Sequence, residues 1–122
     1  MPLISEEYVA AYARATGTNH NHAREKLRRI KEPLRSRIVR AAMTQASLGS
    51  QGLHDPIEDE PLLRQVLEQA EQEAKMSLAD QGVEMHMGYC HLFWEKKAEI
   101  LADRYGITWF SPADMNPYVL YD

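Results

Sequence analysis

The amino-acid sequence predicts an all-α fold, a small bundle of about four helices followed by a short extended C-terminal tail rich in aromatic residues. Two observations support this prediction. Apolar residues recur at helical spacing along most of the chain, and capping residues and glycines bound these stretches. The 122 residues, of which 44% are hydrophobic and 26% charged, are typical of one soluble globular domain spanning residues 1–122.

The first helix is expected to begin at Ser5, a capping residue followed by two acids, and to end at Gly17. A longer second helix is expected from about residue 20 to 48, after a linker that holds His20 and His22. Its apolar positions have helical spacing: Ala23, Leu27, Ile30, Leu34, Ile38 and Ala41. Pro33 lies inside this pattern and removes a backbone donor, which predicts either a bent helix or two separate helices.

A polar loop rich in glycine and proline precedes the third helix, which is expected to end near Asp80. The fourth helix is expected from about Val83 to Tyr105, because Gly106 is a natural left-handed stop. Residues 107–122 are then expected to form a non-helical tail, apart from about one helical turn after Ser111. This tail packs either on the bundle or on a second copy of the chain.

Charge is segregated along the sequence. Residues 20–50 carry a net charge of +6, and residues 51–84 carry −7. On a helical wheel drawn for one continuous helix, the basic residues flank the apolar stripe, and Glu25 and Glu32 occupy the outer face. This placement favours ion pairs with acidic helices of the same chain or of a dimer.

The basic stretch 24–40 also supports two alternatives, an acidic protein partner and a nucleic-acid backbone. The residues expected to make such contacts are Arg24, Arg28, Lys31 and Arg35. The overall charge of −4 and the lack of aromatic residues among the arginines count against nucleic acid, which is less favoured than ion pairs within the chain or across a dimer.

The segment from Met85 to Leu101 holds two histidines and the only cysteine. Cys90 falls on an apolar stripe with Met87 and Trp94, which favours core packing. His86 and Cys90, four residues apart, form the alternative metal site, and a metal- or thiol-dependent enzyme around His86, Cys90 and His91 is the corresponding functional alternative. The sequence contains neither a CxxC nor an HExxH motif, so no cofactor is predicted.

The tail supplies candidate interface residues, because tryptophan and tyrosine anchor many protein interfaces. They are Trp109, Phe110, Tyr118 and Tyr121. No signal peptide and no membrane-spanning stretch are apparent, so a cytoplasmic location is expected. The favoured hypothesis is an interaction or accessory protein without catalysis of its own, which forms a homodimer or binds another protein.

Overall fold

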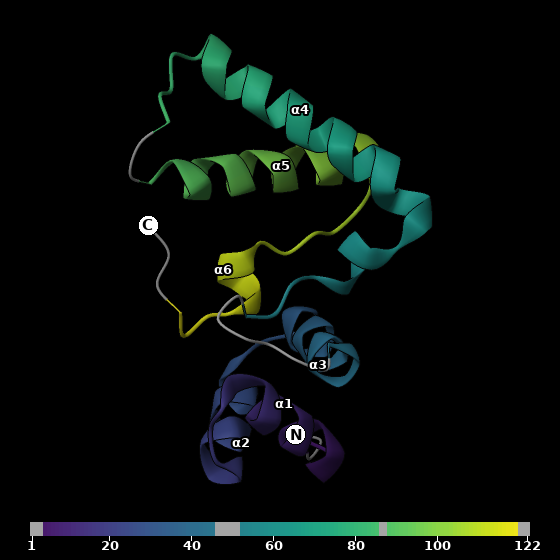
Figure 1. The fold of residues 1–122 in the computed structure, drawn as a ribbon, viewed down its shortest axis with the longest axis vertical. Coiled ribbons are helices and arrows are strands. Elements are labelled where there is room, and N and C mark those ends of the chain that lie inside the picture. The colour runs from purple at the N-terminus through teal and green to yellow at the C-terminus, as the bar shows by residue number, and fades with distance from the viewer. Residues whose placement is uncertain (1–3, 46–51, 86–87, 120–122) are drawn as a thin grey trace. The chain divides into compact units, whose positions relative to one another are not determined.

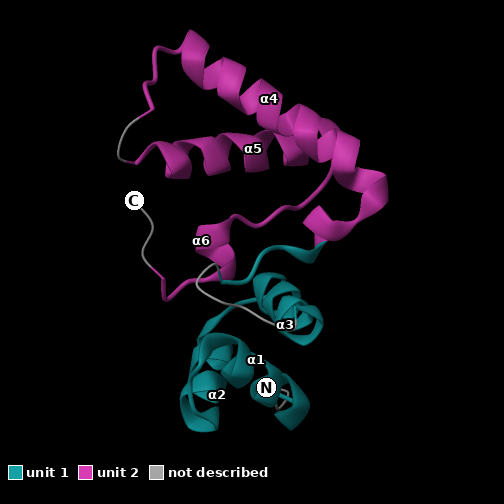
Figure 2. Ribbon diagram, viewed as in Figure 1, with its two compact units in different colours: residues 1–56 teal, residues 57–122 magenta. Residues whose placement is uncertain are grey.

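A computed structural model describes residues 4–45, 52–85 and 88–119. The all-α prediction is confirmed, since this part of the chain contains helices and no strand (Figure 1). The elements are α1 (Glu6–Thr16), α2 (His20–Arg29), α3 (Leu34–Thr44), the 3₁₀ turns η2 (Pro56–Asp59) and η3 (Pro61–Leu63), α4 (Arg64–Asp80), α5 (Tyr89–Tyr105) and α6 (Pro112–Met115). They fall into two compact units, residues 1–56 and residues 57–122 (Figure 2).

The first unit is built on α1, which packs against both α2 and α3. As predicted, Ser5 caps α1, and its hydroxyl accepts a hydrogen bond from the Glu7 N–H. Gly17 ends the helix in the left-handed conformation with φ of 69°, which an L side chain adopts only with strain. Two residues later Asn19 caps α2, accepting a hydrogen bond from the His22 N–H.

The second predicted helix is two helices. The helical pattern stops at Ile30, whose backbone is extended, and resumes after Pro33. Glu32 helps to restart it, because its two carboxylate oxygens accept hydrogen bonds from the Ser36 N–H and hydroxyl, each 2.8 Å long. Breaking the chain here lets α1 bury the apolar faces of both helices. The buried residues of α1, α2, α3 and the connection between the last two are Val9, Ala11, Tyr12, Ala13, Ala23, Leu27, Ile30, Ile38, Val39, Ala41 and Ala42.

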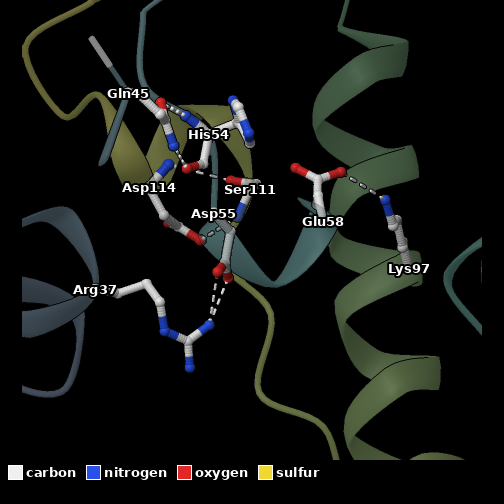
Figure 3. Close-up of polar contacts among 8 residues, drawn as sticks. All are labelled: Arg37, Gln45, His54, Asp55, Glu58, Lys97, Ser111 and Asp114. Carbon is white, nitrogen blue, oxygen red and sulfur yellow. Dashed lines mark hydrogen bonds and ion pairs between the residues drawn. The ribbon is translucent and has the colours of Figure 1, made fainter. Parts of the chain in front are cut away.

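Two polar contacts fix the end of the first unit against α3 (Figure 3). Arg37 Nη1 donates to both carboxylate oxygens of Asp55, at 2.8 and 2.7 Å, and Asp55 is fully buried. The Gln45 side chain donates to the His54 carbonyl and accepts from the His54 N–H. Residues 53–55 have no regular secondary structure, and these side-chain contacts hold them in place.

In the second unit, α4 packs along α5 as an antiparallel pair (Figure 1). The expected start of the last long helix at Val83 was wrong. The helix begins at Tyr89, because Gly88 has φ of 88° and cannot extend a right-handed helix. The core of this unit comprises Leu67, Ala70, Ala74, Ile100, Leu101 and Trp109.

The predicted core stripe of α5 was also displaced. Its buried residues are Lys97, Ile100 and Leu101, whereas Cys90 and Trp94 are only half-buried. Lys97 Nζ lies 3.5 Å from Glu58 Oε1 (Figure 3). It lies 2.8 Å from Glu71 Oε1. It also lies 4.2 Å from the centroid of the Trp109 ring. Two carboxylates and an aromatic face therefore compensate the buried ammonium group.

Replacing Lys97 by methionine is expected to lower the free energy of unfolding by about 2 kcal/mol, because a charged hydrogen bond and a cation–π contact are lost. Glu58 and Glu71 keep some exposure and can hydrate, which limits the cost. Denaturant unfolding measures it. Lys96→Met is the matched control, since Lys96 pairs with Glu99 at 3.8 Å near the surface, and it should change stability by less than about 0.5 kcal/mol. Equal losses would contradict the assignment.

The tail contains the predicted turn of helix. Ser111 and Asp114 form a reciprocal capping box at the start of α6, and Pro112 occupies its first turn. Trp109 packs in the core of the second unit and is 5% exposed. None of the helices in the described ranges has both the length and the apolar character needed to cross a membrane.

Candidate nucleic-acid interface

Helices α1 and α2 are joined by a turn of three residues, Gly17, Thr18 and Asn19. The turn combines a left-handed glycine that ends the first helix with an asparagine cap that starts the second. The helices it joins pack against each other. A short turn with glycine between two packed helices also occurs in the helix-turn-helix motif, in which the second helix enters the DNA major groove.

Helix α2 has one buried face and a wide polar face. Only Ala23 and Leu27 are buried in it. Its exposed residues are His20, Asn21, His22, Glu25, Arg28 and Arg29. An α-helix with its side chains is about 10–12 Å across, and the DNA major groove is about 12 Å wide, so one helix fits the groove. The exposed side chains at its start are also of the hydrogen-bonding kinds that contact base edges.

The four predicted contact residues have different surroundings. Arg24 Nη2 forms an ion pair of 2.6 Å with Glu6 on α1, so its guanidinium is held within the unit. Arg28 pairs with Glu25 at 2.9 Å, and both side chains are about half exposed. Arg35 lies on α3, 3.8 Å from Glu32, and Lys31 is exposed between the two helices. The structure therefore divides the four residues between two helices and a loop.

The Arg24 side chain forms hydrogen bonds with residues of both helices. Its Nη1 donates to the Asn21 side-chain oxygen at 3.3 Å while Nη2 holds Glu6. Arg24 thereby holds the Asn21 side-chain oxygen, and Asn21 remains exposed. Asparagine pairs bidentately with adenine in the major groove. Arg24 thus contacts both Glu6 on α1 and Asn21 on α2.

From the sequence, His20 and His22 were expected in a linker, and Asn21 and Arg29 were not among the predicted contact residues. The signal that would have found them is the pair Gly17 and Asn19, a helix stop followed two residues later by a helix cap. Residues 1–56 contain nine basic and five acidic residues, a net charge of +4, whereas residues 57–122 contain five and thirteen, a net charge of −8. The overall acidity therefore belongs to the second unit.

The alternative metal site receives no support from geometry. His86 lies outside the described residues, Cys90 is half-buried in the first turn of α5, and His91 is exposed with its ring 5.5 Å from that of Trp94. No group of three or more His, Cys, Asp or Glu side chains within the described ranges is placed to hold a metal ion.

The candidate interface residues of the tail differ in their exposure to solvent. Trp109 is a core residue, Phe110 is half-buried, and Tyr118 is 48% exposed. Tyr121 lies outside the described residues. Tyr118 is thus the one of the three described residues whose exposure suits a contact with another molecule.

Comparisons of the chain with protein-family models, with curated proteins and with solved structures found no match.

Proposed function

We propose that this protein binds double-stranded DNA through the helix-turn-helix formed by α1 and α2, with α2 lying in the major groove. The observation that carries the proposal is the exposure of Arg28 and Arg29 on a short helix that buries only Ala23 and Leu27. On the short α2, with Ala23 and Leu27 turned to α1, Arg28 and Arg29 lie on the exposed face.

Glu25 lies on the same face, and an acid there repels phosphate. Its 2.9 Å contact with Arg28 offsets that charge in the free protein. An exposed ion pair of this kind stabilises a protein by less than about 1 kcal/mol, so Arg28 can exchange Glu25 for a phosphate oxygen. Arg29 is exposed and forms no ion pair with another described residue. These two arginines are the proposed phosphate contacts, and His20, Asn21 and His22 are the proposed base contacts.

Residues 1–56 carry a net charge of +4, because the excess acids lie in residues 57–122, so a protein that is acidic overall can bind DNA with its first unit. Long-range repulsion from the second unit is screened beyond about 8–10 Å at physiological salt, whereas direct contacts between arginine and phosphate are not. We therefore expect weak binding to random sequence, with a Kd of about 10⁻⁴–10⁻⁶ M at physiological salt, and tighter binding to a preferred site.

The test is fluorescence anisotropy with a labelled random-sequence duplex at several salt concentrations. The logarithm of the binding constant should fall linearly with the logarithm of the salt concentration, because each phosphate contact releases counterions. Selection from a randomised duplex pool should then enrich a defined sequence, and Asn21→Ala should relax the preference at one position. No binding at low salt, or binding unaffected by salt, would overturn the proposal.

A further inference from the structure

The outer face of α4 carries a stripe of exposed residues without charge. The stripe starts in the 3₁₀ turn η3 and runs almost to the end of the helix. Its members are Leu62, Gln65, Gln69, Gln72, Met76 and Ala79. Leu62 and Met76 are 88% and 65% exposed. On a helical wheel the stripe lies opposite the buried residues of α4, which include Leu67 and Ala74. It therefore points away from the packing against α5.

The spacing of the stripe is that of a coiled-coil seam. Successive members are alternately three and four residues apart, which is the spacing of the a and d positions of a heptad repeat. Residues 57–122 contain five basic and thirteen acidic residues, yet none of these occupies the stripe. The face of a helix that meets only water usually carries charged residues. An uncharged exposed face at this spacing is instead typical of a helix that pairs with another helix.

Two charged residues border the stripe on one flank. Glu68 and Lys75 directly precede Gln69 and Met76, so both occupy the g position of the repeat, where charges select the partner and its orientation. Both side chains are exposed, and neither forms an ion pair with a described residue. Lys75 Nζ lies 5.9 Å from the centroid of the Phe93 ring, near the limit of about 6 Å for a cation–π contact. Both charges are therefore available to a second helix.

We infer that this stripe is an interface between two copies of the chain, which pair their α4 helices antiparallel about a two-fold axis. In an antiparallel pair the g flanks of the two helices lie on the same side. In the register that places Gln69 of each copy opposite Gln72 of the other, Glu68 of each copy lies beside Lys75 of the other. This pairing occurs twice, as an isologous interface requires.

The same register matches the sizes of the seam residues. Near each end Leu62 meets Ala79 of the other copy, a large residue against a small one, and Gln65 meets Met76. The glutamines at the centre can hydrogen-bond to each other, since each side-chain amide has donors and an acceptor. Three glutamines in each helix limit the apolar area of the seam, so we expect a weak, reversible dimer rather than an obligate one.

Other occupants suit the flank less well. In a parallel pair of the same helices, Glu68 would face Glu73 and Lys75 would face Asp80, so a repulsion offsets an attraction. An unrelated helix that is acidic throughout would be repelled by Glu68, and one that is basic throughout would be repelled by Lys75. A second copy in the antiparallel register places an opposite charge beside both residues.

The inference goes beyond DNA binding and does not depend on it. The interface lies on α4, whereas the proposed DNA contacts lie on α2. A dimer presents two copies of α2, which is the form in which many helix-turn-helix proteins bind paired half-sites. The oligomeric state is measurable without DNA, so the two proposals can fail separately.

Sedimentation equilibrium over a hundredfold range of protein concentration tests the interface. At the highest concentrations the protein should approach twice its chain mass of 14.0 kDa. Glu68→Lys brings two ammonium groups together at each g pair and should raise the dimer dissociation constant at least tenfold. The same change makes this acidic chain less charged, so general repulsion between two copies falls. A loss of dimerisation therefore identifies the flank contact.

Adding Lys75→Glu to that variant restores opposite charges and the original net charge, and it should recover dimerisation. Glu95→Lys is the matched control, because Glu95 is exposed on α5 outside the stripe, and it should not weaken the dimer. A monomer at every concentration would overturn the inference. So would a dimer that Glu68→Lys leaves unchanged, because it would form through another surface.

The seam itself is tested by a gain of affinity. Gln69→Leu with Gln72→Leu replaces the polar centre by apolar side chains and should lower the dimer dissociation constant at least tenfold. Adding Glu68→Lys should weaken this tighter dimer, which separates the antiparallel pairing from non-specific association of exposed leucines. Circular dichroism should show the same helix content in every variant, since all the replaced residues are exposed. An unchanged dissociation constant in the double leucine variant would contradict the assignment of the seam.

Discussion

Replacing Arg37 by alanine is expected to lower the free energy of unfolding by about 3–5 kcal/mol, the range for removing one partner of a buried ion pair. Asp55 is fully buried, and Arg37 Nη1 donates to both of its carboxylate oxygens. Without the guanidinium, the carboxylate is left in the interior without that cation. That uncompensated charge favours detachment of the segment from Leu53 to Asp55 from α3. Circular dichroism during urea unfolding measures the loss.

Arg24→Ala is the control that separates burial from distance. Its contact with Glu6, at 2.6 Å, is at least as short as those between Arg37 and Asp55, but the Glu6 side chain is 71% exposed. Water can replace the partner there, so the expected cost is below about 1 kcal/mol. If both variants lose the same free energy of unfolding, the Arg37 guanidinium is not needed to compensate the buried Asp55 carboxylate.

Much of the fold could be predicted from local signals in the sequence. Ser5 and Gly17 bound α1, Gly106 ends α5, and the capping box at Ser111 starts α6. These features depend on the chemistry of a few neighbouring residues. Lys97 could not be predicted as a core residue, because its burial depends on Glu58 and Glu71, which are distant in sequence. Because every lysine was assumed to be exposed, the core face of α5 was predicted in the wrong place.

The candidate site could be predicted only in part from the sequence. The wheel of residues 20–48 assumed one helix, and the break near Pro33 changes how the face of residues 20–29 is aligned with that of residues 34–44. Pro33 alone allowed a kink or a break. The extended backbone at Ile30 and the hydrogen bonds from Ser36 to Glu32 decide between them, and these depend on packing of both helices against α1. Arg28 was selected from sequence, whereas Arg29 and Asn21 were not.

The double replacement Arg28→Ala with Arg29→Ala is expected to weaken binding to random duplex by about 30-fold at about 0.15 M salt, because each phosphate contact contributes about 0.9 to the logarithmic salt slope. The slope itself should fall by about 1.8. Both side chains are exposed and far from the buried face of α2, so the free energy of unfolding should change by less than about 0.5 kcal/mol. Anisotropy titrations at several salt concentrations supply both quantities.

Arg64→Ala is the matched control, since Arg64 is an exposed arginine of the second unit and its removal changes net charge without touching α2. The affinity and the slope should both stay within error of those of the unchanged protein. If Arg64→Ala weakens binding as much per charge as the double variant does, the protein attracts DNA only through its total charge, and α2 is not the contact surface. If only the Arg28 and Arg29 replacements weaken binding strongly, these two side chains contact DNA directly. Attraction through the total charge alone would make the removal of Arg64 equally costly per charge.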